Sequence, residues 1–580
     1  MKGNERSIPW SLFDGSDSED EEDSVLLSSE KEEEIYLDDF KFHVYFRHHH
    51  VYFPFTVMLQ WHVVVNKYWY KNVMRFCTHV SLRRNFQGSL SFTHLLRPRS
   101  LICCANTSMH TLRGLISSWR DSLEQIVFPH IHRDIEYRTI LQMMQVHPVV
   151  LDLSNCDASV LTFKCLESRA SRLVKLNMCV GRREGLTDSD VSNVLRHAPV
   201  LRFLNLSGNS NLSMRCLRGS ITKTLENLSL EGLFVDSDSW REEIIGKHRH
   251  SLRALNLSQM CVRDRKETSF VFSGLSKLLS LRTLGLANIE RRFLPGDLPA
   301  QLSRIPNLKE LDLSHSNYSW ISDFSIGKSV FLHSLQVLWL RHSNISDNEL
   351  LSIIHMCPKL TDLDIGECAT ISDDGLSAAL CKMRAPLKRL VIDNQYGMCA
   401  WNLNGSGLCC VLKKHADRVL ALSVSNQQNL ASNPNWYKFL SRQLLRLNVC
   451  RLRELNLDVI RNRCHRLKKL VLDDCICITE FDLLRFVTTW SSLRILSLAR
   501  LKLAVTDRVV KKIAEQNSLH RLDIQGCTSA TVASILSVEM STFQKLQYLN
   551  IQDLSLVGGR YKIYKKLAYM LPSCDIIWFS

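Results

Sequence analysis

The chain has 580 residues, of which 45% are hydrophobic and 23% charged, an ordinary globular composition. This length exceeds what one compact core can fill, so several domains or a repeat array are expected. With 22 glycines and 13 prolines, the composition excludes collagen-like segments, mucin-like segments and long flexible linkers.

Residues 1–34 are predicted to form a disordered acidic tail, because they combine low hydrophobicity with high charge. From Asp14 to Asp39 there are thirteen acidic residues and one basic residue, which leaves a net charge of +27 on the rest of the chain. Ser16 and Ser18 stand directly before acidic residues and are candidate phosphorylation sites. The basic body indicates an anionic partner, a tail that folds back, or simply a soluble surface whose Lys and Arg stems cover apolar groups.

The twenty cysteines predict reduced thiols in the cytoplasm or the nucleus. Their spacing matches neither a zinc motif nor a disulfide framework, so no metal site and no cofactor is expected. The polar residues 1–13 do not resemble a signal peptide. The longest apolar stretch, residues 51–65, has about half the length of a bilayer span, so no membrane contact is expected.

The pattern Leu-x-x-Leu-x-Leu recurs along the chain, as in Leu308-Lys-Glu-Leu311-Asp-Leu313. Successive copies are mostly 23 to 29 residues apart, which is the period of leucine-rich repeats. The middle leucine, called the marker leucine below, falls at 151, 176, 204, 228, 255, 284, 311, 338, 363, 390, 422, 447, 470, 496, 522 and 549. One further copy is centred on Ile126, so about seventeen repeats are predicted over residues 120–560.

Two periods within each repeat predict an α/β solenoid. Leu-x-Leu alternates with period two, so the leucines point inward from a short strand while the residues between them face out. A stretch with helical spacing follows, and stacked units share one core. We expect a horseshoe with parallel strands on the concave face and helices outside, closed by a C-terminal cap at residues 561–580. Cys156, Cys368, Cys475 and Cys527 occupy one turn position, where a small buried side chain satisfies backbone groups of its neighbour.

The stretch Cys357-Pro-Lys-Leu-Thr-Asp-Leu-Asp-Ile-Gly-Glu-Cys368-Ala-Thr-Ile-Ser-Asp373 resembles the cysteine-containing leucine-rich repeat. Its Ile371-Ser-Asp373 element, and the related Leu186-Thr-Asp188 earlier in the chain, are predicted to cap outer helices. This repeat is typical of F-box proteins with leucine-rich repeats, the substrate-binding subunits of cullin–RING ubiquitin ligases. The resemblance covers about residues 120–560 and implies an F-box before the repeats.

Residues 35–85 are similar to an F-box in their second half, which reads Val65-Asn-Lys67-Tyr-Trp69-Tyr70 and is followed by an aliphatic Val80-Ser-Leu82. The resemblance implies that Val65, Lys67, Trp69 and Tyr70 contact a Skp1-like adaptor. The first half departs from the family pattern, because residues 35–46 alternate like a strand. The segment is therefore interpreted as a small, helical, divergent F-box-like module or an unrelated aromatic cap, and residues 86–119 as a linker or a degenerate first repeat.

Three functions compete. The resemblance implies the substrate-recognition subunit of a Skp1–cullin–F-box ligase, whose partners are the adaptor, a cullin and a protein substrate. The alternatives are an adaptor-free interaction scaffold and a nucleic-acid binder, the latter disfavoured because the basic residues are scattered. No catalytic motif is recognised, so the chain is not expected to be an enzyme. Candidate substrate contacts are outward residues beside the marker leucines, and a strand-face tryptophan is a typical binding anchor; these candidates are Lys175, Asn177, Phe203, Asn205, Trp339, Asp362, Asp364, Arg389, Arg446 and Lys469.

Overall fold

The computed structural model describes residues 43–44, 79–81 and 99–102 and most of the chain from 109 to 577. The residues not described within that last stretch are 128–146, 155–163, 165, 180–186, 221–222, 296, 317–331, 395–402, 434, 491, 517, 538–542, 544, 555–565, 568–569 and 572–573. The chain divides into two compact units, unit 1 (Met1–Leu308) and unit 2 (Lys309–Ser580).

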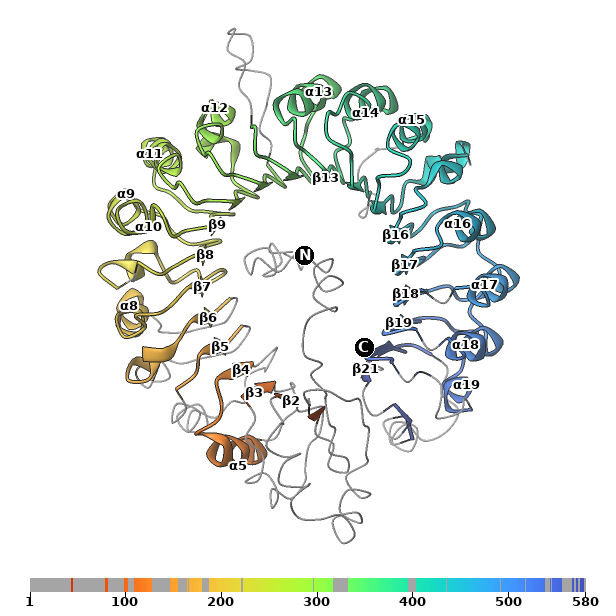
Figure 1. Ribbon diagram of the computed structural model, residues 1–580, viewed down its shortest axis with the longest axis horizontal. Helices are drawn as coiled ribbons and strands as arrows, with labels where there is room; N and C mark the ends of the chain where they lie inside the picture. The colour runs from red at the N-terminus through yellow and green to blue at the C-terminus, as the bar shows by residue number, and fades with distance from the viewer. Residues whose placement is uncertain are drawn as a thin grey trace. The chain divides into compact units, whose positions relative to one another are not determined.

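Each unit is a ladder of short parallel strands (Figure 1). The parallel strands of unit 1 are β2 (His79–Ser81), β3 (Ser100–Ile102), β4 (Gln125–Val127), β5 (Val150–Asp152), β6 (Lys175–Asn177), β7 (Phe203–Asn205), β8 (Asn227–Ser229), β9 (Ala254–Asn256) and β10 (Thr283–Gly285). Those of unit 2 are β11 (Glu310–Asp312), β12 (Val337–Trp339), β13 (Asp362–Asp364), β14 (Arg389–Val391), β15 (Ala421–Ser423), β16 (Arg446–Asn448), β17 (Lys469–Val471), β18 (Ile495–Ser497), β19 (Arg521–Asp523), β20 (Tyr548–Asn550) and β21 (Asp575–Ile577).

Every predicted marker residue is the middle residue of a strand, from Ile126 in β4 to Leu549 in β20. Neighbouring markers also pair in register; Leu338, for example, lies between Leu311 and Leu363. The markers are almost completely buried, because one side chain in each three-residue strand points into the core and its two neighbours point away. The predicted leucine-rich-repeat solenoid is thus confirmed.

A left-handed turn residue follows the strand in most repeats. His342 and Glu367 have φ of 55° and 62°, a region that non-glycine residues seldom adopt. In this conformation the backbone N–H points to the next repeat: His342 N donates to the Gly366 carbonyl at 2.8 Å, and Glu367 N to the Asp393 carbonyl at 2.7 Å. The hydrogen-bond ladder therefore continues beyond the strand, which stabilises the strained turn.

The described helices of each unit lie on one side of its strand ladder (Figure 1). Those of unit 1 are α5 (Met109–Trp119), η2 (Ala170–Arg172), α8 (Asp188–Arg196), η3 (Met214–Leu217), α9 (Ser237–Ser239), η4 (Trp240–Ile245), α10 (Gly246–His248), α11 (Arg265–Leu275), η5 (Arg291–Phe293) and α12 (Leu298–Leu302). Those of unit 2 are α13 (Asp347–Met356), α14 (Asp373–Leu380), α15 (Ser406–Lys414), η6 (Gln428–Ser432), η7 (Trp436–Phe439), α16 (Leu457–Arg463), α17 (Glu480–Val487), α18 (Asp507–Ala514) and α19 (Val532–Leu536).

The Ser-Asp pair at a helix start caps one helix and also links two repeats. Ser346 and Thr187 form capping boxes, as the sequence predicted for this element. The following aspartate bonds sideways: the Asp347 carboxylate accepts from Ser372 N at 2.8 Å and from Ser372 Oγ at 2.6 Å. A Cβ on Gly375 would lie 1.9 Å from Asp347 Oδ1, so glycine there leaves room for this bond. The lateral role of the aspartate was not predicted.

The turn cysteines bond the backbone of the preceding repeat, as predicted. Cys368 Sγ donates to the Leu340 carbonyl at 3.1 Å and Cys475 Sγ to the Val449 carbonyl at 3.0 Å. Cys527 Sγ bonds the Leu498 carbonyl at 3.2 Å. These thiols are fully buried, and burial raises the pKa of Cys368 and Cys527 to about 12. They are packing residues that satisfy carbonyl groups.

The parallel ladder begins before the predicted first repeat. Strand β2 lies in the F-box-like stretch and pairs with β3 of segment 86–119, while β1 (His43–Val44) pairs antiparallel with β2. Segment 86–119 thus contains the paired strand β3 and helix α5 (Met109–Trp119). At the C-terminal end, β21 lies within the predicted cap, residues 561–580, and pairs with β20 of the last predicted repeat. The proposed adaptor contacts Val65, Lys67, Trp69 and Tyr70, the phosphorylation candidates Ser16 and Ser18, and Cys156 lie outside the described residues.

Candidate binding surface on the strand face

The strand face carries two columns of side chains, one residue before and one residue after each marker. The ten predicted contacts divide between them. The first column is half-buried or exposed and holds Lys175, Phe203, Asp362, Arg389, Arg446 and Lys469. The second column is mostly more buried and holds Asn177, Asn205, Trp339 and Asp364.

Three of the second-column candidates have a structural task. The Oδ1 atoms of Asn177, Asn205 and Asp364 each accept a hydrogen bond from the backbone amide two residues later, at 3.1, 3.0 and 2.9 Å. Short Asn and Asp side chains form such turns readily. All three residues are at most 9% exposed and the turn occupies one of their oxygens. Asn177 and Asn205 therefore offer a partner little surface, whereas Asp364 keeps a second carboxylate oxygen and its charge.

Trp339 lies between two aspartates on neighbouring strands. The register places Asp312 of β11 on one side of it and Asp364 of β13 on the other. Glu310 and Asp362 occupy the first-column positions of these two neighbouring strands, β11 and β13. Trp339 itself is half-buried. These five residues, called the Trp339 cluster below, combine one aromatic ring with four carboxyl groups in one patch.

Arg341 compensates only part of this negative charge. Its Nε lies 3.2 Å from Asp364 Oδ2, and its Nη2 lies 3.3 Å from Asp393 Oδ2. Asp312 accepts a hydrogen bond from Ser314 N at 2.8 Å. Burial nevertheless raises the pKa of Asp312 to about 6, and the charge of Asp364 adds to that rise. Asp312 is thus a buried carboxyl group whose ionised form a nearby positive charge would stabilise.

A basic row continues the first column beyond the Trp339 cluster. It consists of Arg389, Arg446, Lys469 and Arg521, on β14, β16, β17 and β19. The Arg521 guanidinium lies 4.5 Å from the centre of the Tyr548 ring on β20, a cation–π contact. Charge on this face therefore changes from acidic to basic between β13 and β14.

Glu310, Asp312 and Arg521 belong to this surface but were not among the predicted contacts. Each occupies a position directly beside a marker leucine in the sequence. Applying the same positional rule to every repeat would have found them. The rule would not have shown that Arg341 contacts the carboxyl groups of Asp364 and Asp393. Asp393 follows strand β14, two repeats after the strand that precedes Arg341.

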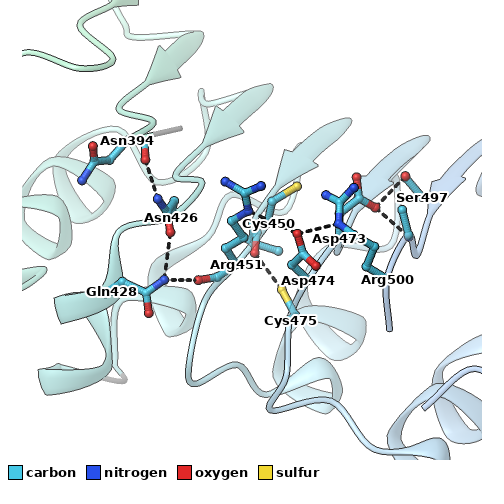
Figure 2. Close-up of polar contacts among 12 residues, drawn as sticks. Asn394, Asn426, Gln428, Cys450, Arg451, Asp473, Asp474, Cys475, Ser497 and Arg500 are labelled. Atoms are coloured by element: carbon cyan, nitrogen blue, oxygen red, sulfur yellow. Dashed lines mark hydrogen bonds and ion pairs between the residues drawn. The ribbon is translucent and has the colours of Figure 1, made fainter. Parts of the chain in front are cut away.

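Polar side chains tie the turns of unit 2 to one another at the edge of this face (Figure 2). Arg451 and Arg500 both contact Asp474 Oδ2, with Nε distances of 3.2 and 2.8 Å. Between the same two repeats that Asp474 and Arg500 join, Ser497 Oγ donates to Asp473 Oδ1 at 2.6 Å. Bonds of this kind fix the turn backbone, so the adjacent strand residues present a preorganised surface.

Among the described residues, no three His, Cys, Asp or Glu side chains converge in a way that could hold a metal ion. Within the same residues, no helix has both the length and the apolar character that a bilayer crossing requires. What the described side chains offer a ligand is an aromatic ring, fixed carboxylates and a row of cations.

No protein-family model matches the chain. A chain of the yeast Rad7–Elc1 complex is similar at 16% identity and a TM-score of 0.39, over 79% of this chain and 90% of that one. A chain of the mouse RP105/MD-1 complex has 15% identity and a TM-score of 0.41, over 86% of this chain and 90% of that one. A chain of the TLR13–ssRNA13 complex has 16% identity and a TM-score of 0.42, over 82% of this chain and 62% of that one. At these scores the likeness carries no conclusion about function, and the assignment to leucine-rich repeats rests on the strand ladder.

Proposed function

We propose that the chain is a non-catalytic recognition subunit that holds a protein partner on the strand face of unit 2. The observation that carries this proposal is the Trp339 cluster beside the basic row, both on strands fixed in register. Such a surface suits a partner segment with a basic residue followed by acidic residues. The basic residue would meet the aromatic ring and carboxylates, and the acidic residues would meet Arg389, Arg446 and Lys469.

Most of the binding free energy of such a surface is expected to come from a few residues. Truncation of a buried aromatic anchor typically costs about 2 kcal/mol or more, which is roughly a thirtyfold loss of affinity. A cation placed over the ring of Trp339 would add about 0.5–2 kcal/mol. The basic row would mainly set the association rate and its dependence on salt.

We further propose that this partner is presented to a ubiquitin ligase through a Skp1-like adaptor and a cullin. Two features favour this finer proposal: the cysteine-containing repeat, and the Val65, Lys67, Trp69 and Tyr70 pattern that precedes the repeats. An adaptor-free scaffold is the alternative, because the first half of residues 35–85 departs from the F-box pattern.

The adaptor should be tested with point variants of the full chain. Deleting residues 1–85 would remove β1 and β2 and expose the edge of β3, so a loss of binding could reflect damage to the sheet. The double variant Trp69→Ala/Tyr70→Ala avoids that fault. We expect the intact chain to co-purify with Skp1 and a cullin, and the double variant to lose both. If the intact chain recovers neither protein, the ligase proposal fails and the scaffold remains.

The partner surface needs its own test, independent of the adaptor. Proteins that co-purify with the full chain from cells would be quantified by mass spectrometry for the wild type, Trp339→Ala, Arg446→Glu and Arg508→Glu. Arg508→Glu is the control for Arg446→Glu. It makes the same charge change at an exposed position of helix α18, away from the strands. A protein reduced tenfold or more by the two strand variants, but not by the control, identifies the partner. Equal recovery in all four samples would exclude this surface.

A further inference from the structure

Unit 1 contains an open groove at the amino end of β7 to β10, the strands that Figure 1 shows in yellow and green. One residue before each of these strands lines it, in the order Arg202, Glu226, Arg253 and Arg282. The strands pair in register, so these four side chains stand about one strand spacing, ~4.8 Å, from one another. We call this feature the arginine groove.

The arginine groove has more positive charge than its one acid can neutralise. Glu226 shares its two oxygens between Arg202 and Arg253, at 3.5 Å in each case. Arg282 is exposed and has no acidic partner among the described residues. His250 also lines the groove. Three guanidinium groups against one carboxylate make this a site for an anionic ligand.

The neutral polar side chains of the groove are already hydrogen-bonded to neighbouring groups; Ser251, for example, bonds the ring of His248. Ser280 Oγ donates to the His250 carbonyl at 2.8 Å, and Asn307 Nδ2 donates to the Leu279 carbonyl at 2.8 Å. The three arginines are therefore the charged donors that the groove offers an anionic ligand. Arginine binds carboxylate and phosphate oxygens through two parallel N–H donors, so the ligand class is an acidic or phosphorylated peptide.

We propose that the arginine groove binds the chain's own acidic segment, residues 14–39. The charges match, because this segment has a net charge of −12 and the rest of the chain +27. Its end also lies within reach, since Asp39 stands four residues before β1, the strand that pairs with β2. This proposal concerns unit 1 and does not depend on the function proposed for unit 2.

The length of the segment is sufficient. Six strand steps separate β1 from β7 and nine separate it from β10, or about 29 to 43 Å at the usual strand spacing. Twenty-six residues extend to about 85 Å at full stretch. A tethered ligand of this length has an effective concentration in the millimolar range, so weak contacts suffice for occupancy. An acidic partner protein would have to displace the segment.

The test measures binding of a fluorescent peptide with the sequence of residues 14–39 to two full-length proteins. One is the native chain; in the other, the thirteen acidic residues of the segment are replaced by Asn or Gln. We expect the peptide to bind the neutralised chain at least tenfold more tightly than the native chain, whose groove is occupied. Equal binding to both proteins, or no binding to the neutralised chain, would overturn the proposal.

The site is located with charge reversals in the neutralised chain. Arg202→Glu/Arg282→Glu should weaken peptide binding at least tenfold, and the control Lys266→Glu/Lys277→Glu, on exposed positions of unit 1 outside the groove, should not. Equal effects of both pairs would reduce the proposal to non-specific attraction. A peptide phosphorylated at Ser16 and Ser18 should bind more tightly, and weaker binding would contradict an arginine site. Displacement by single-stranded RNA at a lower concentration than by acidic peptide would assign the groove to nucleic acid instead.

Discussion

Replacing Asp312 with Asn should stabilise the chain at neutral pH. Asp312 is 8% exposed, and burial raises the pKa of its carboxyl group from 3.8 to about 6. The side chain holds its turn through Oδ1, which accepts from Ser314 N at 2.8 Å. Asparagine keeps that oxygen and its shape. The substitution therefore removes a poorly solvated charge while leaving the hydrogen bond in place.

The magnitude follows from the pKa difference of Asp312 between the two states. A difference of about two pKa units corresponds to about 3 kcal/mol. Between about pH 4 and pH 6 the folded chain keeps the proton that the unfolded chain has released. The contribution of Asp312 to stability is therefore most favourable below about pH 4, falls as the pH rises to about 6, and is constant above.

The assay is urea denaturation of wild type and Asp312→Asn from pH 4.5 to pH 7.5. The difference between the two proteins should grow with pH and level off at up to about 3 kcal/mol near pH 7. Asp523→Asn is the matched control, because Asp523 makes the same turn bond at 3.0 Å but is half-buried. A pH-independent difference, or a destabilised Asp312→Asn, would refute the reasoning.

The remaining predictions concern turns and helix starts. Alkylation at pH 8 should modify the exposed Cys261 long before Cys368, whose thiol is buried with a pKa of about 12; peptide mass spectrometry measures both rates, and equal rates would contradict the buried turn. Asp347→Ala should lower the free energy of unfolding by about 1–2 kcal/mol in urea, because two hydrogen bonds to the next repeat disappear. Gly407→Ala should cost more than 2 kcal/mol in the same assay, since its Cβ would lie 2.1 Å from a backbone oxygen of α14. Gly246→Ala, whose Cβ would lie 3.4 Å from the Arg241 carbonyl oxygen, serves as its control and should cost little.

The repeat architecture could be predicted because its signal is local. A marker leucine and its two partners lie within six residues, and the same spacing recurs seventeen times, so the strand centres from β4 to β20 were found. The turn cysteines were equally accessible, since Cys368, Cys475 and Cys527 follow their strands at the same distance. In both cases the physical cause, burial in a shared core, acts on residues that are close in sequence.

The charged surfaces could not be predicted in the same way, because they depend on contacts between repeats of unequal length. Arg341 contacts both Asp364 of the Trp339 cluster and Asp393, which follows Arg341 by 52 residues in the chain. The arginine groove likewise joins side chains 24 to 29 residues apart along four strands. Asn177 and Asn205 were predicted as partner contacts because they occupy outward strand positions. In the structure, their side chains instead accept hydrogen bonds from the backbone of the following turn.

Asp312 connects stability with binding on the strand face. If a partner places a cation beside Asp312, the carboxyl group must be ionised in the complex, whereas in the free chain its pKa is about 6. Affinity for a basic segment should then fall by up to about tenfold per unit as the pH drops below 6, because binding must release a proton. Asp312→Asn should bind more weakly and lose this pH dependence while gaining stability, as expected where function retains an unfavourable charge. Titration of the identified partner at pH 7.5 and pH 5 measures both effects. An unchanged pH dependence in Asp312→Asn would place the cation elsewhere on the face.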